Sequence, residues 1–554
     1  MQLYSALSPE ARLLIDEAIA HLQGEYDPAT GLVTETFEGT PYRSVRNSMY
    51  YALGVLLRDD PGAEETAETI CRAVLSLQFN APGEIFHGTF RHPDDPVPPD
   101  GLFSFHAVSP TMRYMGDVAW ENILCSFSRE LAADPSLKDQ AEHIEKTLNR
   151  ALIRTIPVAW DTYEPNLREF IGMTFAMLLE HFEGRLSPQL LADIRQSCRM
   201  LMDGAMERVE KDLTPLNTNI RIMYIFLLDY FSRKLESPHW REESLLQARR
   251  LLNEYREHHA CAEFNSPTYC GVDLSTLGFW RRYGSTEELR TLGSELEEGI
   301  WQDMADFYNP SMRAFSGPYS RSYELDMSIH TCFYDILFLG LGAERFPYHP
   351  FSIESVINPL TVLGDIRIPA SVIPRFLETQ APRMVTRQFR ELSERGEPGN
   401  NHALCTAQAW ISPDFMAGAL SGSENPSHQL HPLVIFWRAP GGIGTICVLR
   451  SLPDGTMNHL HTVLFDGHVR EQDADLLVTN KVRRDVIVFF EISCPGLAMD
   501  QLSDGCWQLP GRTFILKTGD GEPSVTRTGE QTVRICYTLK PGASQSFELS
   551  WSST

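Results

Sequence analysis

The sequence lacks the features that mark membrane-spanning and nucleic-acid-binding proteins. No segment reaches about 18 consecutive apolar residues, the length that predicts a membrane span. No run of Lys and Arg occurs, and 48 basic residues stand against 73 acidic ones, which gives a formal net charge of −25. A field of that sign repels nucleic acid and anionic membrane surfaces, so we expect neither as a partner.

Motifs for metal, nucleotide and disulfide chemistry are also missing. The 11 cysteines show no CxxC or zinc-ligand spacing, and P-loop, dinucleotide-binding, nucleophile-elbow and HExxH patterns are absent. His459 and His461 alternate along a possible strand but have no third ligand, so no metal site is predicted. The first residues lack a basic segment followed by an apolar one and indicate a helix capped by Ser8. We therefore expect no secretory signal and a cytoplasmic location.

Helical periodicity dominates the first two thirds of the chain. Hydrophobic residues make up 43% of the sequence and charged residues 22%, the balance of a globular protein. Apolar residues recur at helical spacing in 44–57, 67–77, 170–182, 220–230 and 328–341, and further helical stretches lie around 117–134, 138–152, 187–209, 241–257 and 285–308. About ten to twelve helices of this kind suit a closed ring of helical hairpins, an α/α toroid over residues 1–345.

Near residue 383 the spacing of the apolar residues changes from the helical period to a period of two, the alternation typical of strands. Short segments rich in β-branched and aromatic residues follow, separated by Gly, Pro and Asp turns: 433–437, 444–449, 461–465, 485–491, 513–516, 532–538 and 546–551. Such a series predicts an antiparallel β-sandwich over 383–554. The stretch 346–382 contains several prolines and is interpreted as a linker. The expected fold is thus an N-terminal toroid followed by a C-terminal β-sandwich.

Two polar segments stand at the starts of apolar helices. Glu263, Asn265 and Tyr269 bring a carboxylate, an amide and a phenol to a loop that enters a helix. Asn217 and Asn219 open the very apolar helix that follows them. The simplest alternative is that these side chains only cap helices. Capping explains one Asn at the start of a helix more easily than two. Both segments are therefore candidate sites.

A third segment precedes the last helix of the predicted toroid. Tyr319 and Tyr323 bracket Arg321, and Asp326 follows them. The alternative here is a loop in which Arg321 pairs with a neighbouring acid.

A fourth segment, residues 84–106, is too long and too rich in proline to be a helix. It contains His87 and His106, which a cleft-lining loop would present to a ligand. Arg46, earlier in the chain, is a candidate for the same rim. A plain surface loop is the alternative.

At these residues the chain resembles the heparinase II/III and alginate lyase superfamily, whose members have an incomplete α/α toroid followed by antiparallel sheets. The segment Glu263–Tyr269 is similar to the family's Glu-x-Ser-Pro-x-Tyr segment, which carries the catalytic tyrosine. The segment Asn217–Asn219 lies where the family has an Asn-Asn-His-like segment. Ile220 stands where these lyases commonly have histidine.

The resemblance implies β-elimination on a uronic-acid-containing glycan, without a metal or organic cofactor. Asn219 and Arg321 would neutralise the substrate carboxylate, and Tyr269 would act as base, acid or both. A free tyrosine has a pKa near 10, so Arg321 is also the expected cation beside it. The remaining candidates complete the site: Glu263 in the catalytic group, and Asn265, Asn217, Tyr319, Tyr323, Asp326, His87, His106 and Arg46 at the substrate. A homo-oligomer is possible.

Three other hypotheses remain open. An inverting glycoside hydrolase on the same toroid would use Glu263 and Asp326, roughly 6.5–9.5 Å apart. A dehydratase or isomerase of a small metabolite would use a tyrosine-lined cavity. A non-catalytic binding protein would explain the missing histidine. Tyr269→Phe should abolish a lyase, whereas Glu263→Gln should abolish a hydrolase.

Overall fold

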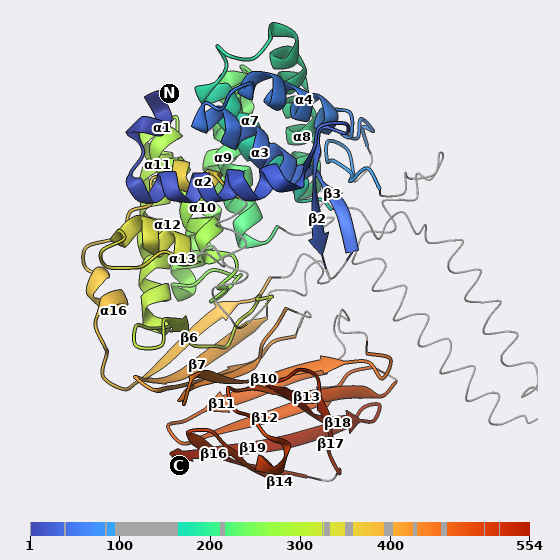
Figure 1. Ribbon diagram of the computed structural model, residues 1–554, viewed down its shortest axis with the longest axis vertical. Helices are drawn as coiled ribbons and strands as arrows, with labels where there is room; N and C mark the ends of the chain where they lie inside the picture. The colour runs from blue at the N-terminus through green and yellow to red at the C-terminus, as the bar shows by residue number, and fades with distance from the viewer. Residues whose placement is uncertain are drawn as a thin grey trace, which may run out of the picture.

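The computed structural model places helices before sheets, in the predicted order (Figure 1). It describes residues 2–37, 40–83, 86–94, 164–210, 216–323, 325, 333–349, 358–392, 403–424, 429–455, 463–482, 484–503, 505–519 and 521–553. The predicted helices around 117–134 and 138–152 lie outside these residues.

Apolar helices form the first part of the fold. The helices are α1 Gln2–Ala6, α2 Pro9–Glu25, α3 Val45–Arg58, α4 Ala63–Leu75, α7 Leu167–His181, α8 Pro188–Glu210, α9 Thr218–Lys234, α10 Pro238–His258, α11 Cys270–Tyr283, α12 Glu287–Phe307, α13 Phe333–Leu341, α15 Leu360–Leu363 and α16 Ile373–Leu377. The predicted cap of α2 is confirmed, since Ser8 Oγ accepts a hydrogen bond of 3.1 Å from the backbone N–H of Ala11.

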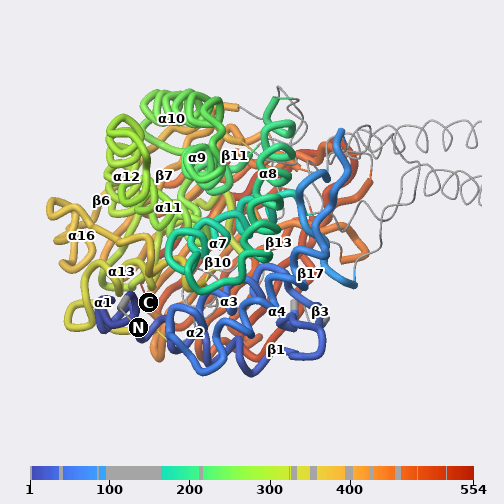
Figure 2. Tube along the Cα trace, turned by 90° about the horizontal axis from the view of Figure 1, so that it is seen from above, coloured from blue at the N-terminus to red at the C-terminus, as the bar shows by residue number. Residues whose placement is uncertain are grey.

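The helices pack in two layers (Figure 2). Helices α3, α7, α9 and α11 lie inside and pack against one another in that order, while α2, α4, α8, α10 and α12 surround them. The inner helices are buried on most of their faces, as their continuous apolar character predicts. A polar residue on an inner helix is therefore held in a low-dielectric interior, where its electrostatic effect is large.

Small strands accompany the helices. A three-stranded sheet, in the order β1-β2-β3, is made of β1 Tyr26–Asp27, β2 Leu32–Phe37 and β3 Thr40–Ser44, and it leads directly into α3. The pair β4 Tyr308–Asn309 and β5 Ala314–Phe315 follows α12.

Two antiparallel sheets form the C-terminal part. Their strands are β6 Arg383–Arg390, β7 Leu404–Ser412, β8 Phe415–Ser421, β9 Leu433–Ala439, β10 Gly442–Ser451, β11 Val463–Val469, β12 Asp473–Asn480, β13 Val486–Ser493, β14 Leu502–Ser503, β15 Cys506–Leu509, β16 Arg512–Thr518, β17 Ser524–Arg527, β18 Thr532–Leu539 and β19 Ser544–Ser553. One sheet has the order β17-β18-β13-β10-β9-β8-β7-β6, and the other β11-β12-β19-β16-β15-β14.

Aromatic side chains join the two sheets face to face. Trp437 of β9 meets Phe514 of β16 with ring centroids 5.1 Å apart, and Phe415 of β8 meets Trp551 of β19 at 4.9 Å. Alternate residues along β12 and β18 point into this interior. The predicted β-sandwich is therefore confirmed.

The helical part is fixed to the sandwich through the loop that follows β5. The backbones of Tyr319 and His431 exchange two hydrogen bonds, of 3.2 and 3.0 Å. At Gly418 of β8, an added Cβ would lie 1.7 Å from the carbonyl oxygen of Gly317, so only glycine permits the contact. Arg387 of β6 also pairs with Asp306 of α12 at 2.6 Å. The loop that carries Arg321 is thus held at the boundary between the two parts.

Candidate active site

The guanidinium of Arg321 is the centre of a cluster of predicted site residues. Its Nη1 donates to Glu263 Oε1 at 2.6 Å, and its Nη2 donates to the hydroxyl of Tyr269 at 3.2 Å. Its Nε donates to Oε1 of Gln429 at 2.7 Å. The guanidinium carbon also lies 4.4 Å from the centre of the Tyr269 ring, a cation–π contact. One cation therefore joins residues from three separate segments of the chain.

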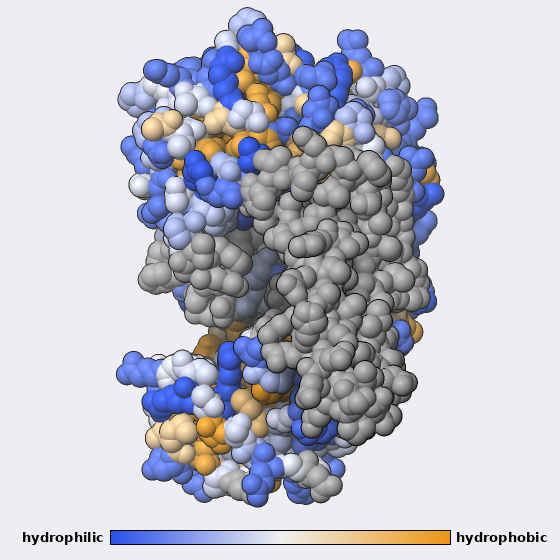
Figure 3. Space-filling view, turned by 90° about the vertical axis from the view of Figure 1, so that its right-hand side faces the viewer, coloured by the Kyte–Doolittle hydropathy of each residue, from blue (hydrophilic) through white to orange (hydrophobic). Residues whose placement is uncertain are grey.

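Tyr269 and Tyr323 form a pair of phenols that reaches solvent. Their hydroxyl oxygens are 3.0 Å apart, and either can donate. Tyr269 is half-buried at the start of α11, whereas Tyr323 is 44% exposed. On the face shown in Figure 3, both the helical part and the sandwich expose mostly hydrophilic side chains, with smaller hydrophobic patches between them. The exposed end of the pair gives the hydroxyl of Tyr269 a route to ligand and solvent.

The phenol of Tyr269 is neutral in the free protein. Burial raises its pKa well above the ordinary value, Arg321 opposes that rise, and Tyr323 and Glu263 add to it. The predicted cation is in place, but it does not lower the pKa overall. The reason is that burial outweighs the effect of Arg321, whose charge is also shared with Glu263 at 2.6 Å.

Glu263 holds the cluster together from inside. Its Oε1 accepts from Arg321, and its Oε2 accepts from the backbone N–H of Asn219 at 3.2 Å. Its own backbone N–H donates to Thr218 Oγ1 at 3.2 Å, and its side chain is 1% exposed. The carboxylate thus accepts a hydrogen bond from a backbone N–H at the N-terminus of α9. It also places a negative charge there, which the helix dipole favours. With both oxygens occupied and no access to solvent, Glu263 is unsuited to the predicted acid or base of a hydrolase.

The two asparagines at the start of α9 do not cap it. Asn217 occupies the N-cap position, but its side chain makes no capping hydrogen bond. The side-chain oxygens of Asn217 and Asn219 are buried and have no hydrogen-bond partner within the described part of the chain. Because such oxygens are costly to leave unpaired, the simple capping interpretation fails for both residues.

Asp273 is a further member of the cluster, since Glu263 and Arg321 both act on it. It lies one turn after Tyr269 on α11 and is 4% exposed. Its Oδ1 has no hydrogen-bond partner in the described residues. Burial raises its pKa well above the ordinary value, Glu263 adds to the rise, and Arg321 opposes it. Burial and the neighbouring Glu263 therefore both disfavour the charged form of Asp273.

Arg46 supplies a second cation, which acts on the phenols and on the carboxyl group of Glu35. It is half-buried in the first turn of α3, and its guanidinium carbon lies 5.1 Å from the ring centre of Phe170. No carboxylate lies within ion-pair distance of it among the residues that the structure describes. Burial works to lower its pKa, but Tyr50, Glu35, Tyr323 and Tyr269 together raise it. Its charge therefore acts on both phenols of the cluster.

Several predicted substrate contacts are wrong or lie elsewhere. Tyr319 is fully buried, and its hydroxyl donates to the carbonyl of Phe315 at 2.7 Å, so it cannot stack on a sugar. Asn265 donates its amide hydrogens to the carbonyls of Ser316 and Pro318, at 2.8 and 2.9 Å, which fixes the Arg321 loop rather than a ligand.

His87 lies in a different cluster, between α7 and α8. It is 5% exposed, and its Nδ1 accepts from the backbone N–H of Ala81 at 3.1 Å. Burial lowers its pKa, as does the neighbouring Arg168. His87 is thus a structural residue. The predicted residues His106 and Asp326 lie outside the described residues.

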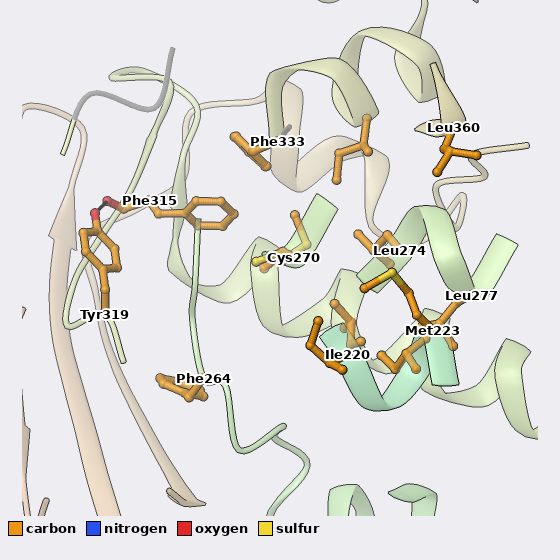
Figure 4. Packing of buried hydrophobic residues seen from close by; sticks show 14 of the residues in the cluster. Ile220, Met223, Phe264, Cys270, Leu274, Leu277, Phe315, Tyr319, Phe333 and Leu360 are labelled. Atoms are coloured by element: carbon orange, nitrogen blue, oxygen red, sulfur yellow. Dashed lines mark hydrogen bonds between the residues drawn. The ribbon is translucent and has the colours of Figure 1, made fainter. Parts of the chain in front are cut away.

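Ile220, at the position where the related lyases commonly have histidine, belongs to the core. It is 2% exposed and lies among Met223, Leu274 and Leu277 (Figure 4). No second base is available at this position.

No pattern in the sequence pointed to Gln429. It reaches Arg321 from the loop before β9, 108 residues further along the chain. A single glutamine in a loop has no distinctive pattern, so only its proximity in space identifies it.

A second buried charge cluster lies at the N-terminus of α7. Arg168, Glu169 and Arg208 are at most 2% exposed. Neither carboxylate oxygen of Glu169 has a hydrogen-bond partner in the described part of the chain, and Arg208 donates to Asn166 Oδ1 at 2.9 Å. Burial raises the pKa of Glu169 to about 7, although Arg208 and Arg168 oppose the rise.

Because of Glu169, the free energy of unfolding falls as the pH rises from 4.5, the ordinary pKa of a glutamate, to about 7, the pKa of this residue in the folded chain. In that window the folded chain keeps a proton that the unfolded chain releases. We expect Glu169→Gln to remove the fall and to stabilise the protein by roughly 3 kcal/mol at about pH 8, with little change at about pH 5. Urea unfolding at both pH values measures this. Glu288→Gln on the surface is the control, with an expected change below about 1 kcal/mol at either pH.

A family model matches residues 12–133 and 142–352, more than half of the chain. The chain belongs to this family. Its description is "Domain of unknown function (DUF8769)". The matched region of this DUF8769 member contains the described helices α3 to α13 and every residue of the Arg321 cluster except Gln429. No curated protein matches the sequence.

Solved structures that match include polysaccharide lyases, the class that the sequence motifs resemble. A chondroitin AC lyase of Streptomyces coelicolor A3, in complex with chondroitin sulphate, is 10% identical over 99% of this chain and 80% of its own, with a TM-score of 0.43. A heparan sulfate lyase of Pedobacter heparinus is 10% identical over 98% of this chain and 88% of its own, with a TM-score of 0.29. A heparinase III gene product is 10% identical over 99% of this chain and 85% of its own, with a TM-score of 0.32.

Within the described residues, no helix has the length and apolar character that crossing a membrane requires. The same residues contain no group of three or more His, Cys, Asp or Glu arranged to hold a metal ion.

Proposed function

We propose that the protein is a lyase that cleaves a uronic-acid-containing polysaccharide or oligosaccharide by β-elimination, on an incomplete α/α toroid. One observation carries the proposal. The hydroxyl of Tyr269 lies between the guanidinium of Arg321 at 3.2 Å and the hydroxyl of the exposed Tyr323 at 3.0 Å. This arrangement gives a phenol a stabilising cation on one side and an exit for its proton on the other.

The first requirement of the reaction is to neutralise the substrate carboxylate, because the neighbouring C5 proton is otherwise too weakly acidic. Arg46 forms no close ion pair in the described residues, although Glu35 acts on it electrostatically, and its charge acts on both phenols. Asn219 belongs to the Arg321 cluster, because its backbone N–H donates to Glu263. In the proposal, Arg46 and Asn219 bind the carboxylate and stabilise the negative charge that develops on it.

Tyr269 then carries the proton. Its phenol first loses a proton through Tyr323 to solvent, and Arg321 stabilises the phenolate. The phenolate takes the C5 proton, the C5–H electron pair forms the C4–C5 double bond, and the C4–O bond breaks. The departing oxygen receives the proton from Tyr269. Water is not consumed, and no group other than these side chains is needed for the proton transfers.

The proposal is tested by following elimination directly. Uronate glycans incubated with the protein in ¹⁸O-labelled water should give products with ultraviolet absorbance from the new double bond and no ¹⁸O. A hydrolase would give reducing ends that carry ¹⁸O and no such absorbance. Products of the second kind, or no product from any glycan, would overturn the proposal. Binding without turnover would favour the non-catalytic hypothesis.

Removal of the charge of Arg46 tests its proposed contact with the carboxylate. We expect Arg46→Gln to raise KM by about 10- to 100-fold, with a smaller loss in kcat, because the contact is present before and during the reaction. Arg43→Gln is the matched control, since Arg43 lies three residues earlier, on β3, but pairs with the exposed Asp94. Steady-state kinetics should separate the two variants. Equal effects would remove Arg46 from the site.

A further inference from the structure

The loop 319–322, which carries the central cation of the site, is shaped by the sandwich. The segment 429–431, just before β9, runs antiparallel to it through the backbone bridge at His431. The backbone N–H of Ser322 donates to the carbonyl of Gln429 at 2.9 Å. The ring Nε2 of His431 lies 3.1 Å from the carbonyl oxygen of Ser322. The sandwich therefore fixes the backbone of this loop.

The helical part holds the same loop from the other side. The carbonyl of Phe264 accepts from the backbone N–H of Ser320 at 3.2 Å and from its hydroxyl at 2.7 Å. The hydroxyl of Ser266 donates to the carbonyl of Arg321 at 2.6 Å. The side chain of Arg321 thus begins from a backbone that both parts of the fold hold in place.

Three acceptors then fix the direction of the Arg321 guanidinium. Its Nε donates to Gln429 at 2.7 Å, its Nη1 to Glu263 at 2.6 Å and its Nη2 to Tyr269 at 3.2 Å. A guanidinium is planar and its N–H groups form a rigid fork, so bonds at Nε and Nη1 determine where Nη2 points. Solvent has little access to replace the first acceptor, because Gln429 is 6% exposed.

The acceptor on the sandwich side carries no charge. A carboxylate at that position would place a second negative charge beside Arg321, which Glu263 already pairs. The pKa of Tyr269 is raised first by burial and further by Glu263, and another carboxylate would add to the rise. An amide oxygen orients the cation without this effect.

We infer that Gln429 is a positioning residue, which directs the guanidinium of Arg321 at the hydroxyl of Tyr269 without neutralising it. The sandwich then contributes to the reaction, and the active site is complete only with the segment 429–431 in place. The inference rests on the proposed function, in which Arg321 stabilises the phenolate of Tyr269.

Gln429→Met tests the loss of the acceptor with a side chain of similar length. We expect kcat to fall by about 10- to 100-fold with KM nearly unchanged, because a displaced cation weakens the transition state and Gln429 is not proposed to bind the ligand. Gln408→Met on β7 is the matched control, since the amide oxygen of Gln408 lies 3.3 Å from the ring of the exposed His468. A kcat for Gln429→Met within about threefold of the wild type would overturn the inference.

Gln429→Glu keeps an acceptor for Nε and adds a negative charge. We expect the pH at which kcat is half-maximal to rise by about one unit, with kcat regained above it, because the added carboxylate disfavours the phenolate of Tyr269. A residue that only stabilises the fold would leave this midpoint in place. An unchanged midpoint therefore also contradicts the inference.

A measurement on Arg321 itself separates this inference from the proposed chemistry. The Nε–H signal of Arg321 in ¹⁵N spectra is identified by its loss in Arg321→Lys. We expect its hydrogen exchange to be faster by about tenfold or more in Gln429→Met, and no faster in Gln429→Glu. If this holds while no glycan is cleaved, the elimination chemistry is wrong and the orientation of Arg321 by Gln429 stands. If glycans are cleaved but exchange is unchanged in Gln429→Met, the inference is wrong and the chemistry stands.

Discussion

Tyr269→Phe is expected to lower kcat by about a thousandfold, within the range that a single group for proton transfer contributes. Phenylalanine fills the same space and keeps the ring below Arg321, so the cation–π contact at 4.4 Å is retained. The variant loses the hydroxyl that bonds Arg321 and Tyr323. KM should change little, because the hydroxyl contributes mainly in the transition state.

The neighbouring phenol gives the control for this variant. Tyr323→Phe removes one hydrogen bond and the exit of the proton but leaves the hydroxyl of Tyr269 in place. A loss of about tenfold is expected, the value of one neutral hydrogen bond. Circular dichroism and thermal unfolding should be unchanged in both variants. If Tyr269→Phe keeps more than about a tenth of the wild-type kcat, another group transfers the proton and the proposed mechanism is wrong.

Arg321→Met is expected to cost about 3–5 kcal/mol of stability, the usual result of leaving one partner of a buried ion pair without the other. Glu263 is 1% exposed and cannot turn to solvent. The variant also loses the hydrogen bond to Gln429, which links the helical part to the sandwich. Urea unfolding monitored by tryptophan fluorescence measures the loss.

A double variant distinguishes the lost charge pair from lost packing. Arg321→Met combined with Glu263→Gln removes both charges, and the amide oxygen can still accept from the backbone N–H of Asn219. Its stability should return to within about 1–2 kcal/mol of the wild type. Turnover should remain lost, because the cation beside Tyr269 is still absent. A double variant no more stable than the single one would show that Arg321 stabilises the fold by packing instead.

That helices precede strands could be predicted from the sequence, because apolar residues recur with a different period in the two parts. Continuous apolar helices such as 170–182 and 220–230, and alternating strands such as 532–538, have strong local patterns. Strand β8, Phe415–Ser421, was not predicted. Nearly all of its residues are buried, and Gly418 lies in its middle, so it shows neither alternation nor a strand-forming composition. The glycine is required by contact with the backbone of Gly317, which no local pattern shows.

The local chemistry of the site was also readable in part. The sequence placed Glu263 and Tyr269 in one loop and selected Arg321 as the cation beside the phenol, and the structure brings these three together. The sequence treated Tyr319 and Tyr323 alike. The structure buries the first against Phe315 and exposes the second by 44%, because the loop between them is pinned to His431.

By itself, the sequence determined which segments are helices, which are strands and which short loops carry polar groups, because period and residue type act over a few neighbours. Only the tertiary structure decided that Glu263 is sealed from solvent, that Arg321 is the cation paired with it, and that Gln429 reaches the site. Burial and charge compensation depend on segments far apart in the chain, so no local pattern encodes them.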